Sequence, residues 1–80
     1  MKLKIITPES IVFSGEVELV SLPGKYGSFS VLENHAPFIT TLQKGVLSYA
    51  TGEGSINIEV EAGFVEVNKN TVTVCLELFK

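Results

Sequence analysis

The sequence predicts an all-β domain, a flattened sandwich or barrel of two antiparallel sheets with roughly eight to ten short strands. Val, Ile and Thr are abundant, and no window places apolar residues at the i, i+3, i+4, i+7 spacing of an amphipathic helix. Several segments alternate apolar and polar residues, as a strand with one buried face does. Glycine, proline and asparagine separate these segments at short intervals, where they favour turns.

One domain, residues 1–80, accounts for the whole chain, because no repeat, low-complexity tract or linker divides it. A domain of 80 residues buries only about 60% of the surface that its unfolded chain exposes. Hydrophobic residues nevertheless make up 45% of the sequence. Because monomers seldom expose large contiguous apolar patches, we expect part of this apolar surface to contact a partner.

The first half of the chain contains a strand with apolar residues on both of its faces. Over residues 16–22, Val17 and Leu19 fall on one face, whereas Val20 and Leu22 fall on the other. We therefore expect part of this strand to be covered on both sides. That makes it a candidate for partner contact.

The second half is expected to form two hairpins, because the loops between its strands are short. Residues 46–50 pair with residues 55–61, and residues 64–68 pair with residues 71–78. In the second strand of each hairpin, alternation predicts one row of residues that faces the core. These rows are Ile56, Ile58 and Val60 in residues 55–61, and Val72, Val74, Leu76 and Leu78 in residues 71–78. Turns are expected at Thr7-Pro8, Ser14-Gly15, Pro23-Gly24, Lys44-Gly45, residues 51–54, Ala62-Gly63 and residues 68–70.

Composition excludes several classes of function. Six basic and nine acidic residues give a net charge of -3, and without clustered cations we expect no nucleic-acid partner. The longest apolar runs are far shorter than the roughly 20 residues of a membrane-spanning helix. The chain reaches Thr7-Pro8 too soon for the apolar region of a signal peptide. With Cys75 as its one cysteine, it offers neither an internal disulfide nor a zinc site.

The one histidine, His35, lies near Ser28, Ser30 and Glu33 in the sequence. An imidazole beside a serine and a carboxylate can act as a general base. Catalysis also needs a nucleophile and an oxyanion hole in one geometry, and no motif such as G-x-S-x-G is present. We therefore expect His35 to form hydrogen bonds within its loop or with a partner. A small hydrolase that uses His35 is kept as an alternative.

Glycines and glutamates could also indicate chemistry. Gly24 and Gly27 precede a predicted strand, not the helix that a phosphate-binding loop needs, so they predict a turn with Lys25 and Tyr26 at an exposed tip. Cys75 is expected to be a small packed side chain. The glutamates that alternate with apolar residues predict a solvated face: Glu16, Glu18, Glu59, Glu61 and Glu66. No catalytic residue, metal site or cofactor is predicted.

The order of the motifs is more informative than any single residue. After Pro8 the chain reads VFSGEVELVSLPG, then GSFSVLENHAPFITTLQKGVLS, then AGFVEVNKNTVTV. Over essentially all 80 residues, this order and spacing resemble the N-terminal β-domain of the epsilon subunit of the F-type ATP synthase. The most specific matches are Phe13, Gly15, Val17, Pro23, Gly27, His35, Ala36, Pro37, Thr40, Leu42, Gly45, Gly63, Glu66, Val67 and residues 72–74.

The resemblance implies a two-sheet sandwich and a non-catalytic subunit of the central stalk, which turns with the rotor and couples ion translocation to ATP synthesis. The implied partners are the gamma subunit and the c-ring, and the chain would meet the membrane only through the c-ring. The implied location is peripheral, on the cytoplasmic side of the bacterial inner membrane or an equivalent energy-coupling membrane. The implied c-ring side is Pro23, Gly24, Lys25, Tyr26, Gly27 and Ser28, and the implied gamma side is Glu33, His35, Pro37, Phe38 and Thr40.

Several positions depart from the family pattern. Ser28 stands where the family often has an acidic residue, so an acidic contact with the c-ring cannot be carried over to it. Ser30 stands where glycine is common in the family, and Glu33 and Asn34 stand where Pro-Gly is usual. Ala62 stands where the family often has a glycine directly before the position of Gly63.

Many family members continue into a C-terminal helical hairpin, which binds ATP in some of them. The sequence here ends at Lys80, so we expect neither nucleotide binding nor inhibition by such a hairpin. The rival interpretation is a free-standing β-sandwich that binds a ligand such as a carbohydrate. Such modules present aromatic side chains for stacking, and this chain has no tryptophan and only Tyr26 and Tyr49 as tyrosines.

Overall fold

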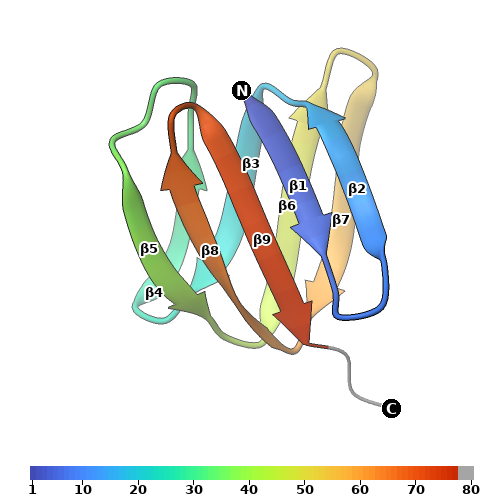
Figure 1. The fold of residues 1–80 in the computed structure, drawn as a ribbon, viewed down its shortest axis with the longest axis vertical. Coiled ribbons are helices and arrows are strands. Elements are labelled where there is room, and N and C mark those ends of the chain that lie inside the picture. Colours follow the sequence, from blue (N-terminus) through green and yellow to red (C-terminus); the bar gives the residue numbers. More distant parts are fainter. Residues whose placement is uncertain (78–80) are drawn as a thin grey trace.

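The computed structural model describes residues 1–77, which fold into nine strands. Figure 1 shows them as two layers with their strands running along the long axis of the molecule. The all-β prediction is confirmed. The strands are β1 (Lys2–Ile6), β2 (Ile11–Glu16), β3 (Leu19–Gly24), β4 (Gly27–Val31), β5 (Phe38–Leu42), β6 (Gly45–Thr51), β7 (Gly54–Val60), β8 (Ala62–Asn68) and β9 (Thr71–Glu77).

The front layer consists of β2, β1, β9, β8 and β5 in that order, and the back layer of β4, β3, β6 and β7. The layers are joined in one hydrogen-bonded path by the pair Gly24 and Leu42, between β3 and β5. The sequence predicted antiparallel pairing throughout, but β1 and β9 pair in parallel, from Lys2 opposite Thr71 to Ile6 opposite Cys75. Parallel pairing is possible here because the whole chain acts as the long connection that it requires.

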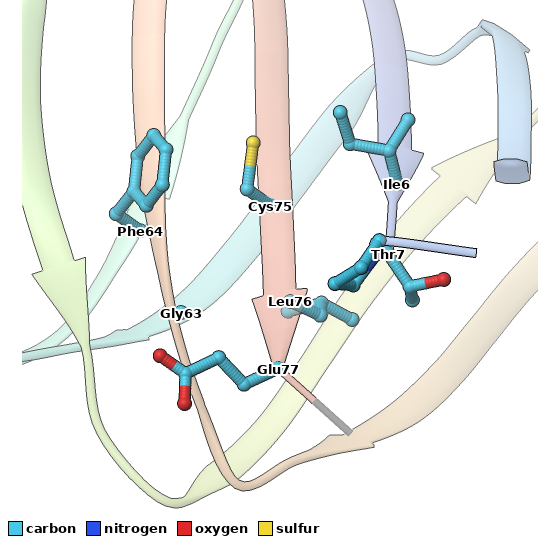
Figure 2. A pocket seen from close by; sticks show the side chains of 8 residues that line it. Ile6, Thr7, Gly63, Phe64, Cys75, Leu76 and Glu77 are labelled. Atoms are coloured by element: carbon cyan, nitrogen blue, oxygen red, sulfur yellow. The ribbon is translucent and has the colours of Figure 1, made fainter. Parts of the chain in front are cut away.

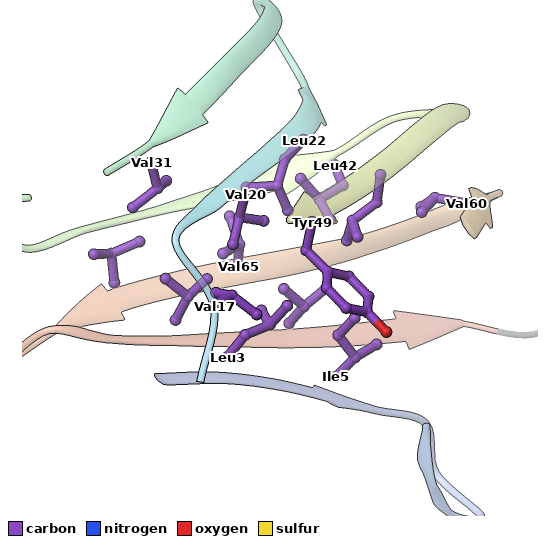
Figure 3. Close-up of a cluster of buried hydrophobic side chains, with 14 of the residues drawn as sticks. Leu3, Ile5, Val17, Val20, Leu22, Val31, Leu42, Tyr49, Val60 and Val65 are labelled. Carbon is purple, nitrogen blue, oxygen red and sulfur yellow. The ribbon is translucent and has the colours of Figure 1, made fainter. Parts of the chain in front are cut away.

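The core lies between the two layers and is apolar throughout. Figure 3 shows side chains from both layers meeting there, among them Leu3 and Ile5 of β1 and Val20 and Leu22 of β3. Among the described residues, no polar or charged side chain is buried. The hydrophobic effect, at about 25 cal/mol per Å² of buried apolar surface, is therefore the main stabilising contribution in this interior.

The strand expected to be covered on both sides has a different structure. β3 begins at Leu19, and the chain bends before it, where Val17 N donates to Met1 O at 2.9 Å and Glu18 N donates to Ala50 O at 2.8 Å. This break changes the alternation, so Val17 and Val20 both face the core, exposed by 4% and 0%. The predicted double coverage is wrong, because the pattern spans a corner between two strands.

Both predicted hairpins are confirmed, as β6 with β7 and, over the described residues, β8 with β9. In β9 the predicted core-facing row Val72, Val74 and Leu76 is buried, whereas Leu78 lies outside the described residues. In β7 only Val60 is buried, Ile58 is half-buried and Ile56 is 50% exposed. β7 is the last strand of its layer, so its inward row is only partly covered.

The turn predictions were accurate where loops connect strands and wrong inside β2, β3 and β8. Ser14-Gly15 lies within β2, Pro23-Gly24 within β3 and Ala62-Gly63 within β8. Glycine is tolerated in a strand where another backbone or side chain approaches closely. The connections near Thr7-Pro8 and Lys44-Gly45, and those at residues 51–54 and 68–70, lie between strands as predicted.

Candidate functional site

The residues that the family resemblance assigns to partners lie along one side of the sandwich, where β4 of the back layer and β5 of the front layer meet. We call residues 23–29 and 33–40 the β4–β5 side. In Figure 1 the β3–β4 hairpin occupies its lower end and the loop before β5 its upper end. The rings of Phe29 and Phe38 connect the two groups edge to face, with their centroids 5.5 Å apart. The two groups predicted for different partners are therefore two ends of one continuous side.

The β3–β4 hairpin presents a rigidly held tip. Pro23 and Gly24 are buried beneath it, and Lys25, Tyr26, Gly27 and Ser28 are exposed. Tyr26 is 90% exposed, and the Nζ atom of Lys25 lies 5.4 Å from the centroid of its ring. A Cβ atom at Gly24 would lie 2.6 Å from the Phe29 ring, so only glycine lets the hairpin close.

Backbone hydrogen bonds attach this hairpin to the neighbouring strand. Gln43 N donates to Pro23 O at 2.8 Å, and Lys25 N donates to Thr41 O at 3.1 Å. Beside the hairpin, residues 24–29 line a hollow of about 330 Å³ together with Phe38 and Thr40. The tip is thus a fixed shape with a shallow depression, which suits contact with another surface.

The loop before β5 holds His35 by contacts within the loop. Its Nδ1 atom lies 2.7 Å from the carbonyl oxygen of Ala36, a geometry that makes Nδ1–H the donor. Its ring centroid lies 5.0 Å from that of Phe38. Asn34 has a φ of 64°, and its backbone N donates to Asn70 Oδ1 at 2.8 Å. The side chains of three of these residues are exposed: Glu33, His35 and Pro37. Those of Phe38 and Thr40 are half-buried.

The serine and carboxylate near His35 in the sequence have other partners. Ser30 Oγ lies 3.0 Å from Ser21 Oγ on the outer face of the back layer. Glu33 Oε1 accepts from the Met1 ammonium at 3.3 Å. The glutamates predicted to form a solvated face are all exposed, and residues 1–77 contain no group of three or more His, Cys, Asp or Glu side chains that could hold a metal ion. Ser30 and Glu33 therefore do not form a catalytic group with His35. The arrangement instead provides surfaces that can contact a partner.

The Met1 ammonium lies between two carboxylates, with Glu16 Oε1 and Glu33 Oε1 both at 3.3 Å. Desolvation lowers the pKa of this ammonium, but hydrogen bonds and Coulomb attraction from Glu16 and Glu33 outweigh it and raise the pKa above its ordinary value of 8.0. These two ion pairs connect the start of β1 to Glu16 at the end of β2 and to Glu33 in the loop that carries His35.

For a chain with a free Met1 ammonium, this raised pKa predicts a stability that depends on pH. The folded state holds the proton more tightly, so the contribution is complete below the unfolded pKa of 8.0 and is lost as the pH rises through the higher folded pKa. Thermal unfolding followed by circular dichroism should show a larger loss of Tm between about pH 7 and pH 10 in the wild type than in Glu16→Gln/Glu33→Gln. Equal losses in both proteins would contradict this account.

Sequence reasoning missed an apolar row on the outer face of the front layer. Phe64 of β8 is the cross-strand partner of Cys75, Cys75 is the partner of Ile6, and Ile6 is the partner of Ile11. Figure 2 shows Phe64, Cys75 and Ile6 beside one another on three neighbouring strands. With Ile39 of β5, which is 66% exposed, these residues form what we call the apolar band.

Three of the five residues of the apolar band, Ile11, Ile39 and Phe64, are exposed. Ile11 is 62% and Phe64 44% exposed. A hollow of about 280 Å³ adjoins Phe64 and Ile6 and extends to Thr7 and Pro8. The sequence did contain a signal, since Ile6 and Ile39 stand out of phase with the buried residues of their own strands. The band identifies a second surface suited to a partner.

The part of the chain that the structure describes has no helix with the length and hydropathy needed to cross a membrane.

Comparison with known proteins agrees with the fold. Residues 1–79 match the family model described as "ATP synthase, Delta/Epsilon chain, beta-sandwich domain". The ATP synthase epsilon chain of Leptospira borgpetersenii is 46% identical over 74 residues, which cover 92% of this chain and 58% of that protein. The ATP synthase epsilon chain of Caulobacter vibrioides is 38% identical over 77 residues, which cover 96% of this chain and 90% of that protein. This chain thus spans less than two thirds of the Leptospira relative.

Two solved structures share the fold. A chain of the Euglena gracilis mitochondrial ATP synthase, in a structure of its OSCP, F1 and c-ring, superposes with a TM-score of 0.86 at 21% identity over 92% of this chain and 48% of that chain. A chain of the Tetrahymena thermophila mitochondrial ATP synthase, in a structure of its central stalk and c-ring, gives 0.84 at 14% identity over 96% of this chain and 63% of that chain.

Proposed function

The chain belongs to the delta/epsilon family of ATP synthase chains, as its β-sandwich domain, and we propose that it is a non-catalytic subunit of the central stalk of an F-type ATP synthase. In this role it binds the gamma subunit and the c-ring and couples ion translocation to ATP synthesis. It acts through contact and stiffness, and the chemistry takes place on other subunits. Its place is peripheral, on the cytoplasmic side of an energy-coupling membrane, which it meets through the c-ring.

The apolar band is the observation that carries this proposal. Exposed Ile and Phe side chains on one face of a sheet are unfavourable in water, and their burial against a partner lowers the free energy. Stable protein interfaces bury about 800 Å² on each partner and have an apolar centre with a polar rim. The band has this layout, because Lys4 and Glu66 lie beside it on the same outer face.

Gamma is assigned to the band and to the loop that carries His35. Ile39 of the band lies between Phe38 and Thr40 in β5, so one partner can contact the outer face of β5 and the loop before it. The c-ring is assigned to the tip formed by Lys25 and Tyr26, a cation and a phenol suited to polar loops. The loop that carries His35 and the tip lie at different ends of the β4–β5 side, which allows the domain to bridge two partners.

Co-purification tests this function. A tagged chain, expressed with its native gamma subunit and c-ring, should retain gamma in mild detergent, and Phe64→Glu should lower the recovered gamma at least about tenfold, because it places a charge in the apolar centre. The matched control is Val46→Glu, since Val46 is 54% exposed on the back layer and should leave recovery unchanged. A wild-type chain that fails to retain gamma would remove the basis of the proposal.

The ligand-binding and hydrolase alternatives have less support. Tyr49 is only 8% exposed and belongs to the core, which leaves Tyr26 as the exposed tyrosine for stacking on a sugar. If His35→Ala removed a measurable hydrolytic turnover while leaving the melting curve intact, the hydrolase alternative would replace the stalk proposal.

A further inference from the structure

We propose that the free edge of β2 binds an extended segment of another protein chain, which adds one strand to the front layer opposite β7. Two independent features converge on this edge. One is a row of backbone groups without a strand partner, and the other is an inward-facing apolar side chain that the front layer leaves half uncovered. The inference does not depend on the stalk function, because its evidence is the backbone edge and the inner side of β2, which the contacts proposed for gamma and the c-ring do not use.

β2 and β7 are the two end strands of the hydrogen-bonded path, and Figure 1 shows them on the same side of the sandwich. Among the described strands, β2 pairs with β1 alone, so its other edge presents unpaired N–H and C=O groups. Native proteins commonly protect such edges with charges, prolines or bulges. β2 has a bulge at Val12 and a charge at Glu16, which leaves residues 13–15 as an unprotected stretch.

The inner side of this edge is incompletely covered. The Phe13 ring of β2 packs on Tyr49, with the centroids 4.3 Å apart. Ile56 is the cross-strand partner of Tyr49 on β7, and it faces inward but remains 50% exposed. Between these three side chains lies a hollow of about 310 Å³. The back layer therefore extends beyond the front layer here, and the hollow is where the next strand of the front layer would place a side chain.

The geometry defines the chemistry of the occupant. A strand added to β2 lies about 4.8 Å beyond it, so its backbone pairs with the free edge while alternate side chains point at Ile56. Those inward side chains are apolar where they meet Phe13, Tyr49 and Ile56, and the β6–β7 turn completes the lining with Thr51, Glu53, Gly54 and Ser55. Glu16 ends the edge with its side chain on the outer face, the face toward which the alternate side chains point, so lysine or arginine suits those positions. The occupant is an extended segment of alternating apolar and basic residues, bound by strand addition.

The test uses a defined probe, the acetylated and amidated hexapeptide of alternating lysine and valine. A control peptide has proline in place of the central valine and cannot pair along its whole length. In titrations of the isotope-labelled chain followed by NMR, the first peptide should slow amide exchange at residues 13–16 by about tenfold or more and shift the methyl signals of Ile56. The proline peptide should do neither.

Variants of the chain separate the two features. Ile56→Asp should weaken binding of the lysine–valine peptide about tenfold, and Glu16→Lys several-fold. Val46→Asp, on the outer face of the back layer, should leave the affinity within about twofold. Because Ile56 is half exposed, the variants should fold, and their melting curves check this.

Three results would overturn the proposal. The first is no binding at millimolar peptide, and the second is exchange protection at β4 or β7 in place of β2. The third is protection at β2 that needs no peptide and grows with the concentration of the chain, since the occupant would then be a second copy of this protein.

Discussion

Replacing Ile5 with alanine is expected to lower the free energy of unfolding by about 3 kcal/mol, the typical cost of a cavity at a fully buried isoleucine. Ile5 is 0% exposed and lies in β1 between Phe13 of β2 and Val74 of β9, so no side chain can move in from solvent to fill the space. A domain of this length has a total stability of roughly 4–12 kcal/mol. The loss should lower Tm by roughly 15 °C.

Ile39→Ala is the matched control for this change, because it removes the same atoms from a side chain that is 66% exposed. Its expected cost is about 0.5 kcal/mol or less. Urea denaturation of both isolated variants measures the difference. Similar midpoints for Ile5→Ala and Ile39→Ala would show that the buried apolar interior between the layers is not what stabilises this protein.

Gly63→Ala is also expected to lower the free energy of unfolding by about 3 kcal/mol. Here the cause is overpacking, whereas Ile5→Ala leaves a cavity. A Cβ atom at Gly63 would clash with the carbonyl oxygen of Cys75 and would lie 3.2 Å from the Cα atom of Leu76. Both neighbours are backbone atoms of β9, so relief requires the β8–β9 pairing to open. Because this pairing extends from Ala62 to Asn68, the change should weaken the centre of the front layer.

Gly52→Ala serves as the control, because a Cβ atom there meets no heavy atom within 4 Å. Its stability should stay within about 0.5 kcal/mol of the wild type. Amide exchange of β9 gives a second readout, which should accelerate in Gly63→Ala and remain unchanged in Gly52→Ala. A fully stable Gly63→Ala protein with normal exchange in β9 would contradict the close packing of these two strands.

Local patterns predicted the hairpins well. The β6–β7 and β8–β9 pairs have short connections, and their register follows from the turn between them. The same reasoning failed where a pattern crossed a corner. Val17 and Val20 have opposite parity along an ideal strand, yet both are buried, because the chain bends at Glu18. Alternation has meaning only within one continuous strand.

The candidate surfaces were predictable in part. The exposed tip at Lys25 and Tyr26 follows from turn-forming residues, whereas the burial of Pro23 and Gly24 beneath it depends on contacts with β5 and β6. The apolar band could not be assembled from sequence, because Ile6, Phe64 and Cys75 are separated by up to 69 positions and meet only through strand pairing.

The sequence by itself determined the all-β class, the hairpins of its second half, the alternation of the last strand and the family resemblance, because each depends on residues that are close along the chain. Tertiary structure alone decided the parallel pairing of β1 with β9, the exposure of Ile56 and the continuity of the β4–β5 side. Each of these depends on which distant strand becomes a neighbour. That choice minimises exposed apolar surface over the whole molecule, and no local window of the sequence contains it.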